Sequence, residues 1–407
     1  MFHNYDGDWF MERQILHIDV NNAFLSWSAI ERLKNGETLD IRTIPSAICG
    51  DENKRSGIIL AKSSLAKSMG VVTGETVYQA IKKCPSLKLY SSDYKVYRKY
   101  SDSLYNLLLE YTDKIERFSV DECFLDMTDF LMGDTLLAKA HEISQRVKNE
   151  LGFTVNVGVS NNKLLAKMAS DFSKPDKIHT LYPNEIKSKI WPLDVSELFM
   201  IGKKTVPKLN NMGIYKIGDL ACFDKNILIR RLGKFGKMAW EYANGIDESE
   251  VIYIHEKAKS IGNSVTLPVD VANYEKLESV LLALVEQVAY RLRKENMLAG
   301  TASVQLRTKD FKDFSHQAKL DFLTDSTSEI YAKAKAILKE MYIEGIAIRL
   351  IGFRVEKLKE SEDQISFFDT QKKEKNKLDE ALDNIKNKYG YMSVKRAGEL
   401  GIDELFK

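Results

Sequence analysis

The sequence of 407 residues lacks an apolar run long enough to cross a membrane as a helix. Such a helix needs roughly 18 to 20 apolar residues in a row, and each apolar stretch here is interrupted sooner. Residues 1–14 carry acids and aromatics rather than a basic region followed by an apolar run, so no secretory signal is predicted. These absences favour a cytoplasmic protein without a membrane partner.

Cysteine is scarce, and its spacing excludes two classes of small site. The four cysteines, Cys49, Cys84, Cys123 and Cys222, lie far apart and form no C-x-x-C pair. Structural zinc sites and disulfide frameworks use closely or regularly spaced cysteines. Neither is therefore predicted, and a reducing compartment is expected.

A net charge is almost absent, because 60 basic residues face 58 acidic ones and leave +2. This balance neither demands nor excludes a nucleic-acid partner, since an acidic metal site and a basic groove cancel in the sum. The apolar fraction of 44% and the charged fraction of 29% are typical of folded globular chains. The length predicts about two to four domains.

What is present begins with carboxylates at two predicted strand ends. Residues 15–20 (ILHIDV) are typical of a short buried strand that carries Asp19, and residues 21–33 follow with helical spacing. Residues 114–127 alternate around a tight centre, which predicts a hairpin with Asp121 and Glu122 at its bend. Carboxylates are the ligands that Mg²⁺ prefers. An isolated Asp-Glu pair is more often a solvated turn, so the spacing alone leaves both interpretations open.

The middle of the chain completes the pattern of an α/β layer. Residues 136–151 and 161–172 are predicted helices, the second with Ser160 as its cap, and residues 153–159 form a strand between them. With the preceding elements, the order predicts a split βαββαβ sheet.

The second half predicts two further modules and a tail. Residues 191–245 are helical and punctuated by glycine, and helices over 277–293 and 327–341 are expected to pack on strands. Beyond residue 357 a charged stretch is followed by a predicted helix over 378–389, and most of this tail is expected to be solvated or loosely attached.

Three segments in order, HIDVNNAFLS, SVDECFLD and VGVSNNKLLAKMASDFSKPD, resemble the signatures of the Y-family DNA polymerases, the translesion class, in their bacterial DNA polymerase IV form. The similarity covers nearly the whole chain from about Met11. It implies an α+β multidomain fold, a right-hand polymerase with a ferredoxin-like palm, small fingers, a helical thumb and an α/β little-finger domain. The implied boundaries are palm 1–22 and 93–181, fingers 23–92, thumb 182–250, linker 251–258, little finger 259–358 and tail 359–407.

The resemblance implies that Asp19, Asp121 and Glu122, with the Val20 carbonyl, hold two Mg²⁺ ions, with Mn²⁺ as a substitute. Phe24, next to Ala23, stands at the place of the aromatic steric gate that excludes a ribose 2′-hydroxyl. Without the motif, an aromatic at helical spacing would be assigned to the core.

The implied contacts to the deoxynucleoside triphosphate depart from the family at one place. Lys174 matches the lysine that binds the triphosphate, whereas Ser64 and Lys67 replace a usual tyrosine and arginine. An ammonium lacks the bidentate fork of a guanidinium, so Arg55 or Lys62 is expected to help.

Two more segments imply partners. Gly202, Lys203 and Lys204 (in MIGKK) resemble a helix-hairpin-helix that binds DNA phosphates without reading sequence, and a Walker loop is excluded because no glycine lies five residues earlier. The pentapeptide QISFF matches the sliding-clamp motif of bacterial polymerases, with a tail docked on its own domain as the alternative. Its residues are Gln364, Ile365, Ser366, Phe367 and Phe368.

The resemblance thus implies a monomeric, low-fidelity enzyme that extends a primer on damaged template DNA. The alternative is a catalytically silent relative that binds DNA and the clamp. The presence of all three carboxylates argues against this alternative.

Overall fold

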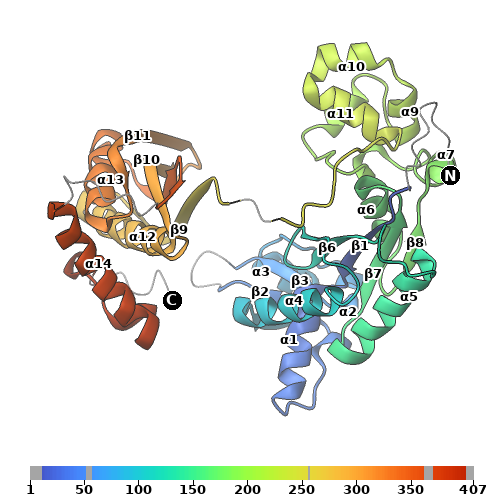
Figure 1. The fold of residues 1–407 in the computed structure, drawn as a ribbon, viewed down its shortest axis with the longest axis horizontal. Coiled ribbons are helices and arrows are strands. Elements are labelled where there is room, and N and C mark those ends of the chain that lie inside the picture. Colours follow the sequence, from blue (N-terminus) through green and yellow to red (C-terminus); the bar gives the residue numbers. More distant parts are fainter. Residues whose placement is uncertain (1–11, 52–56, 255–256, 362–369, 400–407) are drawn as a thin grey trace. The chain divides into compact units, whose positions relative to one another are not determined.

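The structure is a computed structural model that describes residues 12–51, 57–254, 257–361 and 370–399 (Figure 1). The chain divides into two compact units, residues 1–50 with 58–255, and residues 51–57 with 256–407. None of the described helices is long and apolar enough to cross a membrane.

A five-stranded sheet forms the centre of the first unit. Its order is β5-β6-β1-β7-β8, and β1 pairs antiparallel with both β6 and β7. The strands are β1 (Ile15–Val20), β5 (Ile115–Arg117), β6 (Glu122–Asp126), β7 (Val155–Ser160) and β8 (Ile178–Thr180). The sequence did not predict β8, a three-residue strand that is only half-buried and carries little apolar signal.

The two faces of this sheet differ because side chains alternate along each strand. Leu16, Ile18 and Val20 of β1 join a large apolar core with α1 (Ala23–Lys34), α4 (Tyr94–Leu108) and α5 (Leu136–Arg146). The opposite face carries the polar residues His17 and Asp19, and α6 (Lys163–Asp171) covers it. One face of β1 therefore packs in the apolar core, and the other carries polar side chains.

The approach of α6 to the sheet depends on Gly158 in β7. A Cβ atom at this position would meet the Ala166 carbonyl oxygen at 1.8 Å, so only glycine allows the helix to lie this close. The predicted cap of α6 is wrong by two residues: Asn162 caps it through Leu165 N–H, because Ser160 is still in the strand and donates to the Leu181 carbonyl.

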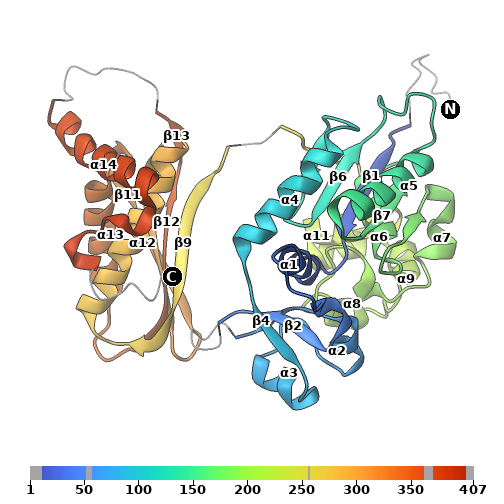
Figure 2. The same cartoon turned by 90° about the horizontal axis from the view of Figure 1, so that it is seen from below.

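A small sheet of order β3-β2-β4 lies below in Figure 2, with α2 and α3 beside it. Its elements are β2 (Ser46–Cys49), β3 (Ile59–Lys62), α2 (Ser64–Ser68), α3 (Val77–Lys83) and β4 (Lys88–Ser91). It has its own apolar core around Ile59, Ala66 and Val77. It lies within residues 23–92, where the fingers are expected from the sequence.

A helical module ends the first unit. It consists of α7 (Ile186–Lys189), α8 (Val206–Asn210), α9 (Ile217–Cys222), α10 (Lys225–Leu232) and α11 (Lys234–Ala243). These helices share a core with the buried side of α6, through Leu164, Leu165 and Met168. Helix α6 therefore packs both on the face of the sheet that carries His17 and Asp19 and on the helical module.

The second unit is a sheet of order β11-β10-β12-β9 that packs on two long helices. Its elements are β9 (Ser260–Val271), α12 (Tyr274–Lys294), β10 (Met297–Thr308), β11 (Asp313–Thr324), α13 (Thr327–Met341), β12 (Ile348–Glu356), β13 (Lys359–Glu360) and α14 (Thr370–Tyr389). Antiparallel pairing and one helical layer match the predicted α/β domain.

Within the tail, α14 is not loosely attached as predicted. Lys386 on α14 lies 2.9 Å from Glu286 on α12, and both side chains are almost fully buried. Asp383 accepts from Arg293, and Asp379 accepts from the Thr327 backbone N–H. The expectation of a solvated tail failed because its charges find buried partners, which the composition of the tail alone does not reveal.

Candidate active site

The candidate site begins where β1 and β6 lie side by side. Asp19 is paired in register with Glu122, so cross-strand geometry places the two carboxylates on the same face. The Val20 N–H donates to the Asp121 carbonyl at 3.0 Å, which ties the end of β1 to the bend of the β5–β6 hairpin. Glu122 is the first residue of β6, and Asp121 precedes it in the bend.

Two lysine ammonium groups occupy the space between these acids. Lys167 Nζ lies 2.7 Å from Glu122 Oε1 and 3.6 Å from Asp19 Oδ2. Lys174 Nζ lies 2.8 Å from the same Asp19 oxygen. Positive charge therefore already sits at Asp19 and Glu122, and oxygen donors of this kind suit a hard divalent cation.

Asp121 does not yet converge on this point. Its Oδ1 accepts a hydrogen bond from Ser119 Oγ at 2.6 Å within the hairpin bend. Accordingly, no cluster of three His, Cys, Asp or Glu side chains in the described part of the chain is arranged to hold a metal ion. The oxygen donors of Asp19 and Glu122 suit a divalent cation, whereas the carboxylate of Asp121 is held by Ser119.

Burial shapes the protonation of this site. Burial is the main cause that raises the pKa of Glu122, and its hydrogen bond with Lys167 partly offsets the rise. Burial also lowers the pKa of Lys167, but its pairing with Glu122 and the nearby acids outweighs this and leaves the pKa raised. Lys167 is therefore a full positive charge at neutral pH.

His17 lies directly under the carboxylates. Its Nδ1 is 2.8 Å from Ser170 Oγ on α6, and its Nε2 is 3.9 Å from Glu122 Oε2 without a hydrogen-bond partner. Burial, followed by the charges of Lys167 and Lys174, holds the pKa of His17 well below its usual range. The imidazole is therefore neutral and adds no charge to the site.

Phe24 in the first turn of α1 is half-buried, and Ala23 before it is buried. The ring of Phe24 stacks on Tyr97 of α4 with centroids 4.3 Å apart and planes 10° apart. The rings of Phe24 and Tyr94 meet edge to face, with centroids 6.1 Å apart. A bulky ring held this firmly can exclude an added hydroxyl. The supporting Tyr97 was not identified from the sequence, because its spacing in α4 is that of an ordinary core residue.

The loop that carries Lys174 is fixed to β1 through Asn21. The Oδ1 of Asn21 accepts from the Asp176 N–H at 2.6 Å and from Thr154 Oγ1 at 3.0 Å. Its Nδ2 donates to Asn156 Oδ1, so this buried amide is satisfied on both sides. Asn21 therefore links the end of β1 to the loop that carries Lys174.

Ser64 and Lys67 are exposed on α2. The strand before this helix is tied to the site by Asn22, whose Nδ2 donates to the Lys62 carbonyl at 2.7 Å. Burial, followed by repulsion from Lys67, lowers the pKa of Lys62, so two cations lie near each other in this segment. Arg55 lies outside the described residues.

Gly202, Lys203 and Lys204 are exposed at the turn before α8. A Cβ at Gly202 would meet nothing within 4 Å, so a phosphate can approach its backbone. Lys163, at the start of α6, pairs with Glu116 at 2.6 Å. The clamp-motif residues 364–368 lie outside the described residues.

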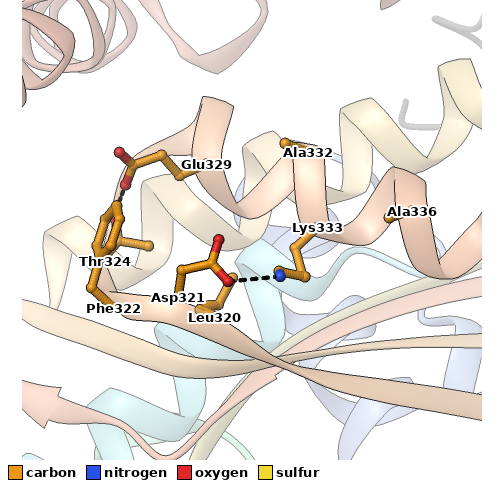
Figure 3. A pocket seen from close by; sticks show the side chains of 8 residues that line it. All are labelled: Leu320, Asp321, Phe322, Thr324, Glu329, Ala332, Lys333 and Ala336. Carbon is orange, nitrogen blue, oxygen red and sulfur yellow. Dashed lines mark hydrogen bonds and ion pairs between the residues drawn. The ribbon is translucent and has the colours of Figure 1, made fainter.

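A surface pocket of about 380 Å³ in the second unit lies between β11 and α13 (Figure 3). Lys333 at its wall is paired with Asp321 at 2.9 Å, and Glu329 accepts from Thr324 Oγ1. None of the residues predicted for the active site lines this pocket.

Comparison with known proteins follows the same division of the chain. The model of the impB/mucB/samB family matches residues 18–171, its helix-hairpin-helix motif matches residues 183–214, and its C-terminal domain matches residues 258–367. The first match contains every predicted metal residue and all the predicted triphosphate residues except Lys174, and the second contains the predicted DNA-binding turn.

Relatives and a solved structure agree with this match. A DNA polymerase IV of Clostridium acetobutylicum is 48% identical over 95% of this chain and 98% of its own length. A DNA polymerase IV of Acetivibrio thermocellus is 41% identical over 95% and 97% of the two chains. A solved Y-family DNA polymerase chimera of Dbh and Dpo4 covers 85% of this chain at a TM-score of 0.75 and 24% identity, which supports the fold.

Proposed function

Because the chain belongs to the Y-family of DNA polymerases, in its bacterial DNA polymerase IV branch, it is a template-directed translesion DNA polymerase, and we propose that Asp19, Asp121 and Glu122 form its catalytic centre. The observation that carries this proposal is the register pair of Asp19 and Glu122 beside two buried or half-buried ammonium groups. The enzyme binds primer-template DNA and a deoxynucleoside triphosphate.

In the reaction, the primer 3′-hydroxyl oxygen loses its proton and forms a bond to the α-phosphorus of the triphosphate. The bond between the α-phosphorus and the oxygen that bridges the α- and β-phosphates breaks, and pyrophosphate leaves. The three carboxylates and the Val20 carbonyl are proposed to hold two Mg²⁺ ions, for which Mn²⁺ can substitute. Such ions lower the barrier by neutralising the triphosphate and activating the attacking hydroxyl. The protein contributes rigid placement of the carboxylates on paired strands.

Substrate handling is proposed to use the cations around this centre. Lys174, with Ser64 and Lys67 and the help of Lys62, binds the triphosphate, and the ring of Phe24 with Ala23 selects the deoxyribose. The helix-hairpin-helix at Gly202, Lys203 and Lys204 binds the DNA backbone. A monomer in the cytoplasm is proposed with this assignment.

The catalytic assignment is tested by primer extension with Asp19→Asn and Asp121→Asn. Each substitution removes one negative ligand, and we expect extension rates to fall by at least about 100-fold with DNA binding retained. Asp129→Asn is the matched control, since Asp129 only pairs with Lys114 at 2.7 Å outside the site. Full activity of Asp121→Asn would exclude its proposed role. Absence of Mg²⁺-dependent extension by the wild type, with DNA binding intact, would favour the catalytically silent alternative.

The pentapeptide Gln364 to Phe368 is proposed to bind the sliding clamp, because two adjacent aromatics after a polar stretch suit a partner's apolar pocket. Deletion of residues 364–368 is expected to weaken clamp binding in a pull-down or calorimetric titration while extension on clamp-free DNA stays normal. Equal clamp affinity of the deletion variant would refute the assignment.

A further inference from the structure

Lys167 is the residue in the candidate site that neither the metal assignment nor the triphosphate assignment uses. It lies in the middle of α6, and only 10% of its side chain is exposed. Its Nζ contacts Glu122 at 2.7 Å, Asp171 at 3.4 Å and Asp19 at 3.6 Å. A buried lysine kept only for stability needs one good partner, whereas this one faces two of the three proposed metal ligands.

Asp171 differs from the other two acids. It lies one turn after Lys167 on the same helix, and its side chain is 48% exposed, against 9% for Asp19 and 18% for Glu122. It also lies 2.9 Å from Lys174. Asp171 is therefore within reach of both ammonium groups without belonging to the carboxylate pair of β1 and β6.

A divalent ion bound by Asp19 and Glu122 would be repelled by an ammonium group that kept its present distances, because like charges a few ångströms apart repel strongly in a half-buried site. Lys167 must then give up Glu122. Asp171 already lies beside it, so the ammonium can shift along its own helix without becoming an unpaired buried charge.

We propose that Lys167 is a positioning residue that holds Glu122 and Asp19 in place before metal binding, and that it transfers to Asp171 when the metal arrives. In the absence of metal it keeps two neighbouring carboxylates from repelling each other. It also competes with the metal for these carboxylates, so it weakens metal binding. This inference rests on the metal site proposed above.

The test is a titration of the full-length protein with Mn²⁺ in the absence of nucleotide. The electron paramagnetic resonance signal of free Mn²⁺ measures how much of the ion is bound. Lys167→Met removes the competing charge, and we expect Mn²⁺ to bind at least about fivefold more tightly. Lys167→Arg keeps the charge and is expected to bind Mn²⁺ no more tightly than the wild type. Lys163→Met is the matched control, because Lys163 is an equally buried lysine on α6 whose partner is Glu116.

Equal or weaker Mn²⁺ binding by Lys167→Met would overturn the proposal. If that variant does not fold, a crystal structure of the wild type with Mn²⁺ decides: Lys167 Nζ should leave Glu122 and stay with Asp171, and an unchanged contact with Glu122 would refute the transfer. Asp19→Asn separates the two levels of inference. If it leaves Mn²⁺ binding unchanged, the metal site itself is wrong; if it weakens binding while Lys167→Met changes nothing, only the role of Lys167 is wrong.

Discussion

At the scale of the residue, Phe24, the proposed steric gate, is also partly a core residue. One side of its ring stacks on the buried Tyr97, and the residue as a whole is only half-buried. A steric gate excludes the ribose 2′-hydroxyl only if its ring stays in place, and the ring of Tyr97 supports that of Phe24. Selectivity for the sugar is therefore expected to depend on two residues.

We expect Phe24→Ala to raise ribonucleotide incorporation strongly and Tyr97→Leu to raise it less, because the second change loosens the gate without removing it. The measurement is the ratio of kcat/KM for dNTP and rNTP in single-nucleotide insertion. Tyr94→Phe keeps the edge contact with Phe24 and serves as the control. If Phe24→Ala leaves the ratio unchanged, Phe24 is a core residue and no more.

How much of the site the sequence could predict also differs from residue to residue. Asp19 and Glu122 were predicted to meet, and the register of two paired strands brings them together. The hydrogen bond from Ser119 to Asp121 depends on the exact shape of the bend, and no spacing rule in the sequence predicts that shape. Lys167 was missed because helical spacing predicts that Lys167 and Asp171 are neighbours but not that both point into the site.

At the scale of the element, α14 reverses the usual rule for an amphipathic helix. Its inward positions are the acidic and basic residues Asp379, Asp383 and Lys386, whereas Leu378 and Tyr389 are 56% and 67% exposed. The sequence correctly predicted a helix here, but apolar periodicity would have docked its other face. The buried partners on α12 decide the orientation.

Asp379→Ala is expected to destabilise the second unit by about 3 kcal/mol, because it leaves Arg396 and the Thr327 N–H without their buried acceptor. Thermal unfolding and hydrogen exchange of the α14 amides measure this effect. Glu380→Ala on the exposed side of the same helix is the control. Normal protection of α14 in the Asp379→Ala variant would show that the ion pairs do not hold the helix.

At the scale of the whole molecule, a net charge of +2 means that DNA affinity has to come from local clusters. Lys203 and Lys204 are exposed, and neither forms an ion pair with any residue in the described ranges. Their charge is therefore free to replace counterions on a phosphate backbone.

Replacing both Lys203 and Lys204 with alanine is expected to weaken binding equally for all DNA sequences. The slope of log affinity against log salt should become shallower by about 0.9 for each phosphate that the protein no longer neutralises. Fluorescence anisotropy at several salt concentrations measures this slope, and Lys216→Ala, an exposed lysine outside the turn, is the control. An unchanged slope in the double variant would place the DNA-binding lysines elsewhere.

The pairing of β1 with β6 has a consequence for inheritance as well as for chemistry. Asp19 meets Glu122 because the strands are in one fixed register, and a shift by a single residue would turn Glu122 to the opposite face of the sheet. Val120 in the bend between β5 and β6 is 41% exposed and can vary in kind. In genetic terms, this hairpin is expected to tolerate an amino-acid substitution far better than the insertion or deletion of a codon.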